Sequence, residues 1–383
     1  MAPELERDDL RLPVFGSVMG LASPCACAAA HPALPRGRRV LLGLMLLACS
    51  LALALAPRAE AAGRSLLIEG AGDGHGVGMS QDGALGFARH GASYQAILAH
   101  YYTGTTIGQA PARAVVRVLV GTKVVRVPLE RYVRGVVAAE MPASWPLAAL
   151  EAQAVASRTY ALASHAGGSR FDVYSDTRSQ VYLGVAAETS RSNQAVADTA
   201  GQVVLYAGKP ATTYFFASSG GMTENIENSF IGSAPEPWLV AVVDPYEEAR
   251  SSAWRVTLSF ASVAARLNGL LKGSFRGIEV LRRGVSPRVV SALVLGSRGD
   301  LTVSGPELAQ RLGLTSTWAY FSVRDGTTVT GEPDRSGRPA GGSAAPAPTP
   351  APASTPVGPQ GGAIAPSPAP PPGEPAAGGV AAG

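Results

Sequence analysis

Residues 129–142, which read LERYVRGVVAAEMP, decide the fold at the centre of this chain. The part from Leu129 to Ala139 has the spacing of apolar residues that is typical of a helix. Pro142 stops this helix, because proline cannot continue one. The stretch therefore predicts a helix that carries an acidic residue, Glu140, at its C-terminal end.

Further helices and strands are predicted on both sides of this stretch. Pro146 opens the next helix, with Ser144 as its expected cap, and the apolar spacing continues to about Ala163. Valine-rich segments on either side of Gly121 predict a β-hairpin. Other helices are predicted at 82–90, 94–102, 259–271 and 306–312, and other strands at 65–68, 203–206, 212–216, 239–243 and 255–258. Mostly short strands with a few packed helices predict an α+β fold.

The N-terminal segment, residues 1–61, is expected to be an extension that ends in a signal peptide. Arginines within 36–39 precede the charge-free apolar segment 40–56, and small residues follow up to Ala61. A positive region, an apolar region and a small-residue site in this order are typical of export, so cleavage is expected after Ala61. An uncleaved membrane anchor at 40–56 is the alternative. Either way, the protein is expected to be extracytoplasmic, secreted or associated with the cell wall.

The composition excludes several classes of protein. All three cysteines precede residue 50, so the mature chain would have no disulfide scaffold, no Cys₄ zinc site and no cysteine nucleophile. The net charge is only +4, and the basic residues are scattered singly, so no nucleic-acid partner is expected. Residues 331–383 are rich in proline, alanine and glycine and predict a disordered tail. Residues 62–330 are left as the folded domain.

Carboxylates are the natural acid–base candidates in this sequence. The core histidines, at 75, 90, 100 and 165, form no HExxH motif, and there is no GxSxG motif. Glu140 lies among apolar neighbours, and burial disfavours a charged carboxylate. A raised pKa of this kind is what a general acid requires. The alternative interpretation is a solvated residue at a helix end that has no chemical role.

A run of glycines occurs between residues 70 and 78, at every second position. It follows a short apolar segment, and the simplest interpretation is a strand that enters an open loop. Glycine permits backbone geometry and close ligand approach that other residues forbid. The spacing does not fit the dinucleotide-binding pattern, so no nucleotide cofactor is expected.

Several segments agree with the pattern of one family. They are GHGVGMSQ at 74–81, LERYVRGVVAAEMP at 129–142, WPL at 145–147, AQAVASRTYA at 152–161, QVY at 180–182, SGG at 219–221, TEN at 223–225 and DPY at 244–246. Together they resemble the SpoIID/LytB family over nearly all of 70–323. That family includes a lytic transglycosylase of peptidoglycan and an amidase enhancer. The resemblance implies an α+β domain with helices and short strands around a glycan-binding cleft.

The resemblance also implies a mechanism. The glutamate of the E-M-P motif is catalytic in SpoIID-like enzymes, and Glu140 matches it. Glu140 would protonate the glycosidic oxygen between N-acetylmuramic acid and N-acetylglucosamine. It would then accept the proton of the sugar's own 6-hydroxyl, giving a 1,6-anhydro product. One carboxylate suffices for this cycle because an internal hydroxyl replaces water, whereas ordinary glycosidases use a pair.

Residues that match the family's cleft are expected to bind the glycan through hydrogen bonds. They are Gln180, Tyr182, Ser218, Ser219, Thr223, Glu224, His75 and Gln81. Alternatives stay open, because Tyr182 would also suit a core and Ser218 and Ser219 a turn. Gln153 and Arg158 are expected to be structural, and Arg158 would tie its helix to a neighbouring carboxylate.

Two features depart from the family pattern. The GHGVGMSQ segment precedes Glu140 here, whereas it usually follows the E-M-P segment, which resembles a circular permutation. Phe216 stands where many members carry histidine, and core cysteines are absent, so no metal or other cofactor is expected.

The expected partners are peptidoglycan glycan strands, with membrane contact only through the signal or anchor segment. A rival interpretation, from a different class of protein, is a non-catalytic glycan-binding module that stimulates a cell-wall amidase.

Overall fold

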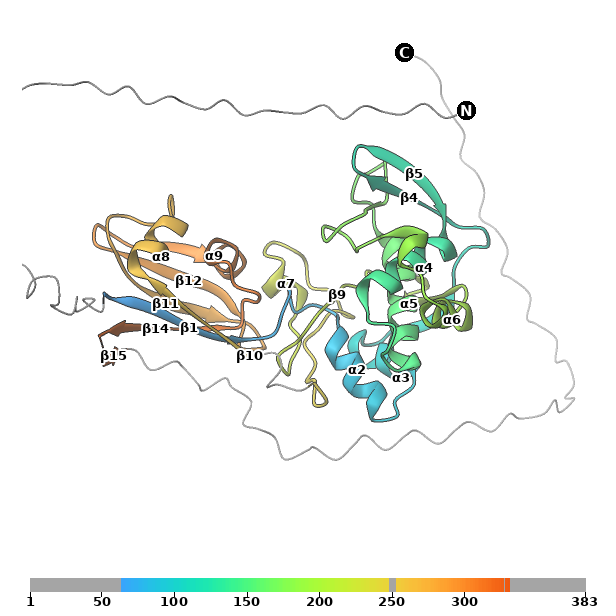
Figure 1. Cartoon of the computed structure of the whole chain (residues 1–383), viewed down its shortest axis with the longest axis horizontal. Coiled ribbons are helices and arrows are strands. Elements are labelled where there is room, and N and C mark those ends of the chain that lie inside the picture. Colours follow the sequence, from blue (N-terminus) through green and yellow to red (C-terminus); the bar gives the residue numbers. More distant parts are fainter. Residues whose placement is uncertain (1–62, 248–252, 327, 331–383) are drawn as a thin grey trace, which may run out of the picture. The chain divides into compact units, whose positions relative to one another are not determined.

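The computed structural model describes residues 63–247, 253–326 and 328–330 of the chain (Figure 1). The signal segment with its anchor alternative, and the proline-rich tail, lie outside these residues. Within them, helices mix with mostly short strands, which confirms the α+β prediction. None of the described helices is both long and apolar enough to cross a bilayer.

The first hydrophobic core is built around helix α5 (Leu147–Ala163), of which nearly every residue from Ala149 to Ala161 is buried. Alanine occupies many of these positions, and its small side chain allows neighbouring helices to approach closely. Four helices pack against it: α2 (Gln81–Arg89), α3 (Tyr94–Tyr101), α4 (Leu129–Glu140) and α6 (Ser190–Asp198). Helix α5 is therefore surrounded by other helices.

Two small sheets accompany this core. Strands β4 (Val115–Val120) and β5 (Lys123–Pro128) form the predicted hairpin, and β6 (Val173–Tyr174) pairs with β4 in parallel. The other sheet has the order β3-β7-β8 and lies against α5 through β7. Its strands are β3 (Thr106–Gln109), β7 (Gln202–Tyr206) and β8 (Lys209–Pro210).

The second hydrophobic core is formed by antiparallel strands and two short helices. One sheet has the order β10-β1-β14-β15 and the other β11-β12-β13. The elements are β1 (Ser65–Ala71), β10 (Ala253–Ser259), α8 (Phe260–Arg266), β11 (Phe275–Arg283), β12 (Val289–Gly296), β13 (Leu301–Ser304), α9 (Gly305–Leu312), β14 (Ala319–Asp325) and β15 (Thr328–Thr330). Apolar side chains that alternate along β12 supply much of the buried face.

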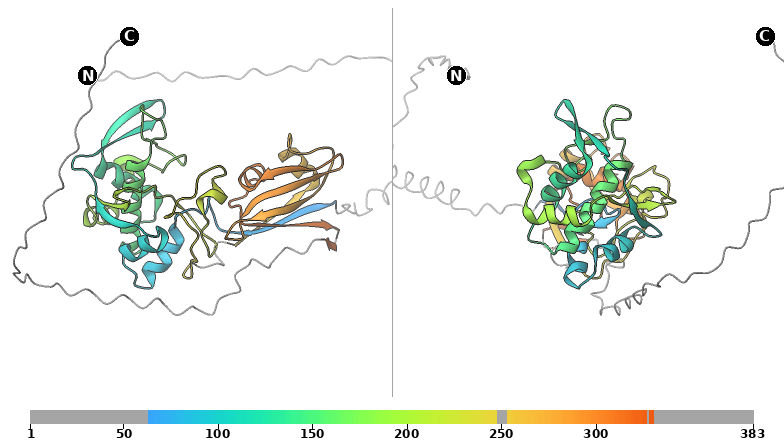
Figure 2. Two further views of the ribbon diagram at one scale, coloured as in Figure 1. Left: turned by 180° about the vertical axis from the view of Figure 1, so that it is seen from behind. Right: turned by 90° about the vertical axis from the view of Figure 1, so that its right-hand side faces the viewer.

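Strand β1 lies in the middle of its sheet, between β10 and β14, and Ile68 is paired with Val256 on one side and with Phe321 on the other. Figure 2 shows this blue strand among strands from the other end of the described sequence. The N-terminal strand is thus an integral part of the second core. The chain then continues from β1 into the first core through the glycine run.

The glycines of that run allow the chain to approach other parts of the protein. Gly76 and Gly78 have φ angles of +85° and +77°, in the left-handed region that favours glycine. A Cβ atom at Gly76 would lie 2.4 Å from Nε of Arg288, and one at Gly78 would lie 2.1 Å from the carbonyl oxygen of Tyr214. Within the described chain, these two glycines make room for protein atoms. After them, β2 (Met79–Ser80) pairs in parallel with β9 (Phe215–Phe216).

Some predicted elements differ from the observed ones. Pro146 is itself the N-cap of α5, without a side-chain hydrogen bond, so the Ser144 cap was wrong. The strand predicted at 212–216 shrinks to β9, and the one at 239–243 is absent apart from a single bridge at Val243. A side chain replaces a neighbouring strand as hydrogen-bond acceptor there, because Val242 N–H donates to Thr223 Oγ1 at 2.8 Å.

The helix predicted at 259–271 ends early, as α8, with Leu267 as its C-cap. Gly269, with a φ angle of +86°, follows shortly afterwards and suits a turn rather than a longer helix. Helix α6 was not predicted, because its sequence is too polar to show helical spacing. Its start does carry a recognisable signal, a capping box between Thr189 and Ser192.

Candidate functional site

Glu140 is the last residue of α4, where the chain leaves the helix through Met141 in an extended conformation. Its side chain is half-buried, and its Oε1 accepts a hydrogen bond of 2.6 Å from the backbone N–H of Val181. Burial raises the pKa of Glu140, while the donors from Val181 and Gln81 oppose that rise. The direction agrees with the expectation drawn from its apolar neighbours in the sequence.

Gln81 is the first residue of α2, and the structure brings it against Glu140 although 59 positions separate the two in sequence. Its Nε2 lies 3.4 Å from Oε2 and 3.4 Å from the backbone oxygen of Glu140. Ser80, the N-cap of α2, accepts from Gly83 N–H and so fixes where the helix begins. The GHGVGMSQ segment and the E-M-P segment therefore meet at Gln81 and Glu140.

Gln180 and Tyr182 lie on either side of the Val181 donor. The side chain of Gln180 is buried, and its Nε2 donates to the backbone oxygen of Ser157 at 3.1 Å. Tyr182 is half-buried and stacks on Tyr132 of α4, with ring centroids 5.0 Å apart. Both side chains thus hold the Val181 loop against α4 and α5. Glycan contacts by these two residues stay a prediction.

His75 has aromatic neighbours, with ring centroids 5.9 Å from Tyr214, 5.3 Å from Phe216 and 5.1 Å from Phe230. Its Nδ1 accepts from Val77 N–H at 3.1 Å. Burial and the nearby charge of Arg288 lower the pKa of His75 to about 4, so the imidazole is neutral at physiological pH. These contacts give His75 a packing role, and its predicted contact with the glycan is untested.

Ser218 and Ser219 bind a carboxylate of the protein itself. Ser218 Oγ donates to Glu247 Oε1 at 2.6 Å, and Ser219 donates to Glu247 Oε2 from both its backbone N–H and its hydroxyl at 2.7 Å. Ser80 Oγ adds a 2.7 Å bond to Oε2 and Gly220 N–H a 2.7 Å bond to Oε1. The two serines are buried, so the structure favours the turn-shaping alternative, through Glu247.

Thr223 and Glu224 lie between β9 and α7 (Ile226–Ser229). Thr223 Oγ1 accepts from Val242 N–H at 2.8 Å, whereas Glu224 bonds to the loop between β11 and β12. Glu224 is fully buried, and its Oε2 accepts from the hydroxyl of Ser286 at 2.5 Å and from its backbone N–H at 3.0 Å. Arg288, also buried, donates to the backbone oxygen of Met222 at 2.8 Å. These contacts occupy Glu224 with protein donors, and a contact with sugar is again untested.

The serine–carboxylate cluster includes a second acid, Asp244, which is 2% exposed. Its Oδ2 accepts from Tyr101 Oη at 2.7 Å and from Ser219 Oγ at 3.1 Å. Burial and the neighbouring Glu247 raise the pKa of Asp244 to about 7. Burial and Glu247 also raise the pKa of Asp82, on α2, to about 6. The N-terminus of α2, which carries Gln81, is therefore held by a cluster that binds protons near neutral pH.

This cluster predicts how stability depends on pH. The folded pKa of Asp244 is above its unfolded value of about 4, so proton binding by Asp244 stabilises the fold. This contribution to the free energy of unfolding is fully present below about pH 4. That contribution is lost as the pH rises towards 7, at up to about 1.4 kcal/mol per pH unit. We expect Asp244→Asn, which keeps an oxygen acceptor, to reduce the fall in unfolding free energy between pH 5 and pH 8. Urea titrations of the full chain measure it.

Asp176→Asn is the matched control, because Arg178 lowers the pKa of exposed Asp176 to about 2, well below the tested window. We expect this variant to keep the parent's pH dependence between pH 5 and pH 8. An unchanged dependence in Asp244→Asn would show that the cluster carries no such proton.

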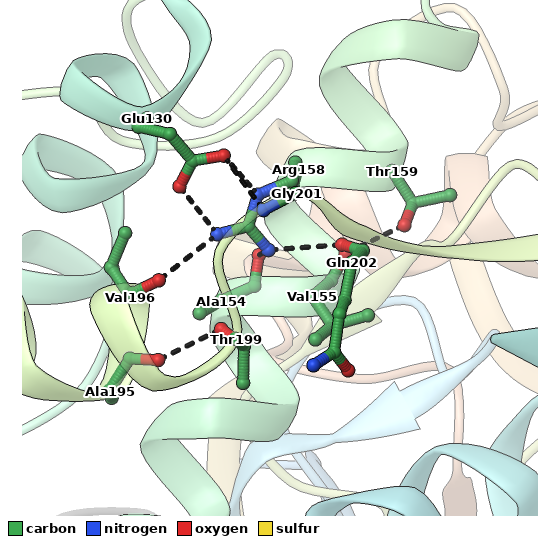
Figure 3. A network of polar contacts seen from close by, with 10 residues as sticks. All are labelled: Glu130, Ala154, Val155, Arg158, Thr159, Ala195, Val196, Thr199, Gly201 and Gln202. Carbon is green, nitrogen blue, oxygen red and sulfur yellow. Dashed lines mark hydrogen bonds and ion pairs between the residues drawn. The ribbon is translucent and has the colours of Figure 1, made fainter. Parts of the chain in front are cut away.

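Arg158, fully buried on α5, forms an ion pair with Glu130 of α4 (Figure 3). Its Nε and Nη2 each donate to one oxygen of Glu130 at 2.8 Å, and Glu130 lies on the first turn of α4. Its Nη1 donates to the backbone oxygen of Gln202 at 3.0 Å. Gly201 N–H also donates to Glu130, at 3.2 Å. The expected tie between Arg158 and a carboxylate is thereby confirmed, and it joins α4, α5 and β7.

Across the described residues, no three or more histidine, cysteine, aspartate or glutamate side chains gather in a way that could hold a metal ion. The polar groups that contact the Glu140 carboxyl group are the side-chain amide of Gln81 and the backbone N–H of Val181.

Comparisons with known proteins show which family this sequence resembles. The SpoIID family model, described as stage II sporulation protein, matches residues 121–206, which include both Glu140 and Arg158. Stage II sporulation protein D of Bacillus subtilis is 30% identical over 244 residues, which are 59% of this chain and 69% of that protein. The amidase enhancer of Bacillus subtilis is 36% identical over 207 residues, 51% of this chain and 28% of that protein.

An uncharacterized protein of Brachyspira hyodysenteriae is 34% identical over 216 residues, and the chain spans 56% of its length. The match to stage II sporulation protein D of Bacillus subtilis combines 30% identity with coverage of more than two thirds of that protein. The chain therefore belongs to the SpoIID family.

Proposed function

We propose that this protein is an exported lytic transglycosylase of peptidoglycan, with Glu140 as its acid and base. The observation that carries the proposal is the state of the Glu140 carboxyl group. It is half-buried, its pKa is raised by burial, and Oε1 is fixed by the 2.6 Å bond from Val181. Among the described residues, its other oxygen, Oε2, has one hydrogen-bond partner, Gln81, at 3.4 Å. Such a group can carry a proton on Oε2 and release it.

The proposed reaction needs no second carboxylate. Glu140 gives its proton to the glycosidic oxygen between N-acetylmuramic acid and N-acetylglucosamine as the bond from that oxygen to the muramic acid C1 breaks. The 6-hydroxyl of the same muramic acid then attacks C1, and Glu140 takes up the hydroxyl proton. The carboxyl group ends protonated again, and no water is consumed. Ordinary glycosidases place a second acid beside the first for the part that this hydroxyl plays.

Product analysis tests the proposal. The full chain is incubated with purified glycan strands, with and without stem peptides, and the products are examined by mass spectrometry. Fragments that end in 1,6-anhydro-N-acetylmuramic acid support the proposal. Fragments with ordinary reducing ends would instead indicate hydrolysis. The comparison of the two substrates shows whether stem peptides help or hinder cleavage.

A second candidate function is stimulation of a cell-wall amidase by a non-catalytic glycan-binding module. The 36% identity to an amidase enhancer favours it. In this case the chain binds glycan strands without cleaving them and raises the rate of an added amidase. Glu140→Gln would then leave the stimulation intact, whereas the transglycosylase proposal makes Glu140 indispensable for product formation. The same preparations therefore separate the two candidates.

A further inference from the structure

A second glutamine lies behind Gln81. Gln153, on α5, is fully buried, and its Nε2 donates to Ser157 Oγ at 2.9 Å. Its Oε1 lies 3.5 Å from Nε2 of Gln81, which is itself 8% exposed. A buried primary amide costs free energy unless its polar atoms have partners. The partners of these two amides lead from the middle of α5 to the carboxyl group of Glu140.

The contacts fix the orientation of both amides. The backbone oxygen of Glu140, 3.4 Å from Gln81 Nε2, can only accept a hydrogen bond, so the nitrogen of Gln81 must face it. Gln153 can then offer only its oxygen to that nitrogen, and its own nitrogen goes to Ser157. Gln153 therefore holds one N–H of Gln81 and leaves the other directed at Glu140.

The two carboxyl oxygens of Glu140 differ in the length of their hydrogen bonds. Oε1 accepts the short hydrogen bond from Val181 N–H. In the protonated acid, an oxygen that accepts such a bond is the one without the proton. The proton is then on Oε2. Once Oε2 gives up that proton it carries negative charge, and Gln81 is the donor that faces it, at 3.4 Å. Hydrogen bonds to a developing charge are stronger than those to a neutral group.

We propose that Gln81 and Gln153 are positioning residues, in which Gln153 orients the Gln81 amide and Gln81 stabilises the carboxylate that forms when Glu140 donates its proton. This inference rests on the transglycosylase function proposed above, because there Glu140 must lose and regain a proton in every cycle. The proton leaves Oε2 for the glycosidic oxygen and returns from the sugar 6-hydroxyl. Neither glutamine exchanges a proton or a bond in either step.

The titration of Glu140 tests the arrangement without any need for activity. The Cδ signal of Glu140 is followed by ¹³C NMR in the full chain and is assigned by its loss in Glu140→Gln. We expect Gln81→Leu and Gln153→Leu each to move the midpoint to higher pH, because each removes a donor to the charged form or its orientation. The double variant should move it no further than Gln81→Leu alone, because Gln153 acts only through Gln81.

Gln202→Leu is the control, since Gln202 lies on β7 and its side chain accepts from Tyr94 rather than contacting Glu140. It should leave the midpoint unchanged. Gln153→Met, which keeps the length of the side chain, replaces Gln153→Leu if the latter does not fold. In the kinetic assay we expect Gln81→Leu to lower kcat about tenfold with KM unchanged, which is the loss of one hydrogen bond to a charged group.

An unmoved midpoint in Gln153→Leu and Gln153→Met, or a double variant that shifts as the sum of the two single variants, overturns the inference. If the midpoints move as expected while the parent chain forms no anhydro product, the glutamine arrangement stands and the proposed function fails. The titration therefore tests the glutamine arrangement, and the product analysis tests the proposed function independently of it.

Discussion

Glu140→Gln is expected to slow glycan cleavage by roughly 10³-fold or more, because a general acid and base contributes about 10²–10⁴-fold and the proposed reaction uses this residue as both. The amide keeps the shape of the side chain and an oxygen acceptor for Val181, whose N–H donates to Glu140 at 2.6 Å. It cannot deliver a proton to the glycosidic oxygen. The measurement is the initial rate of formation of anhydro-ended fragments from purified glycan strands, at equal concentrations of parent and variant.

Glu151→Gln is the matched control for this experiment. Glu151 lies on α5, and burial together with the nearby charge of Asp198 raises its pKa as well. It has the same chemical character as Glu140 but none of the contacts with Val181 or Gln81. We expect the rate of Glu151→Gln to match that of the parent. Equal rates for parent and Glu140→Gln, with both proteins folded, would remove Glu140 from the mechanism.

Arg158→Met is expected to lower the free energy of unfolding by about 3 kcal/mol. The substitution removes a side chain that is fully buried and donates to both oxygens of Glu130 and to the backbone oxygen of Gln202. Glu130 is 38% exposed and can be partly rehydrated, so the expected loss lies at the lower end for a broken buried pair. Urea unfolding of the full chain, with an unchanged m-value, measures the loss.

The exposed pair between Arg178 and Asp176 provides the control, with side chains 60% and 48% exposed. Arg178→Met should cost at most about 1 kcal/mol, because exposed ion pairs contribute little. Arg158→Lys should recover less than half of the loss, since an ammonium group cannot reproduce the paired geometry of the guanidinium. Equal losses for Arg158→Met and Arg178→Met would contradict the role assigned to the buried network.

Helix boundaries in the first core were largely predictable because they depend on local signals. Pro142 and the apolar spacing before it place the end of α4 within one residue, and Ser93, a residue type that favours helix N-caps, caps α3. Helix α6 was not predicted because its sequence is polar, although the capping box between Thr189 and Ser192 is a local signal. The segment at 239–243 was predicted as a strand, but the backbone N–H of Val242 donates to Thr223 Oγ1. That bond joins residues far apart in sequence, so spacing alone does not reveal it.

The candidate site was predictable where chemistry and local burial coincide. Glu140 stands out because its sequence neighbours are apolar, and the structure gives it the expected surroundings. Gln81 was expected to bind the glycan from the family resemblance. Spacing alone could not show that the two residues meet across 59 positions.

The buried acids Asp244 and Glu247 were not foreseen in any role, although Asp244 lies in the DPY segment. Glu247 accepts hydrogen bonds from the hydroxyls of Ser80, Ser218 and Ser219, which come from two separate parts of the chain. Only the folded structure brings these parts together. Serines that sequence reasoning assigned to sugar binding are thereby seen to organise the start of α2, which carries Gln81.

The source of the atoms in the new chain end tests the central claim most directly. The full chain is incubated with purified glycan strands in water enriched in ¹⁸O, and the muramic acid ends of the products are analysed by mass spectrometry. If the sugar's own 6-hydroxyl attacks C1 and Glu140 accepts its proton, the ends are 1,6-anhydro and contain no ¹⁸O. Reducing ends that carry ¹⁸O would show that water attacks instead, and the single-carboxylate mechanism would be contradicted.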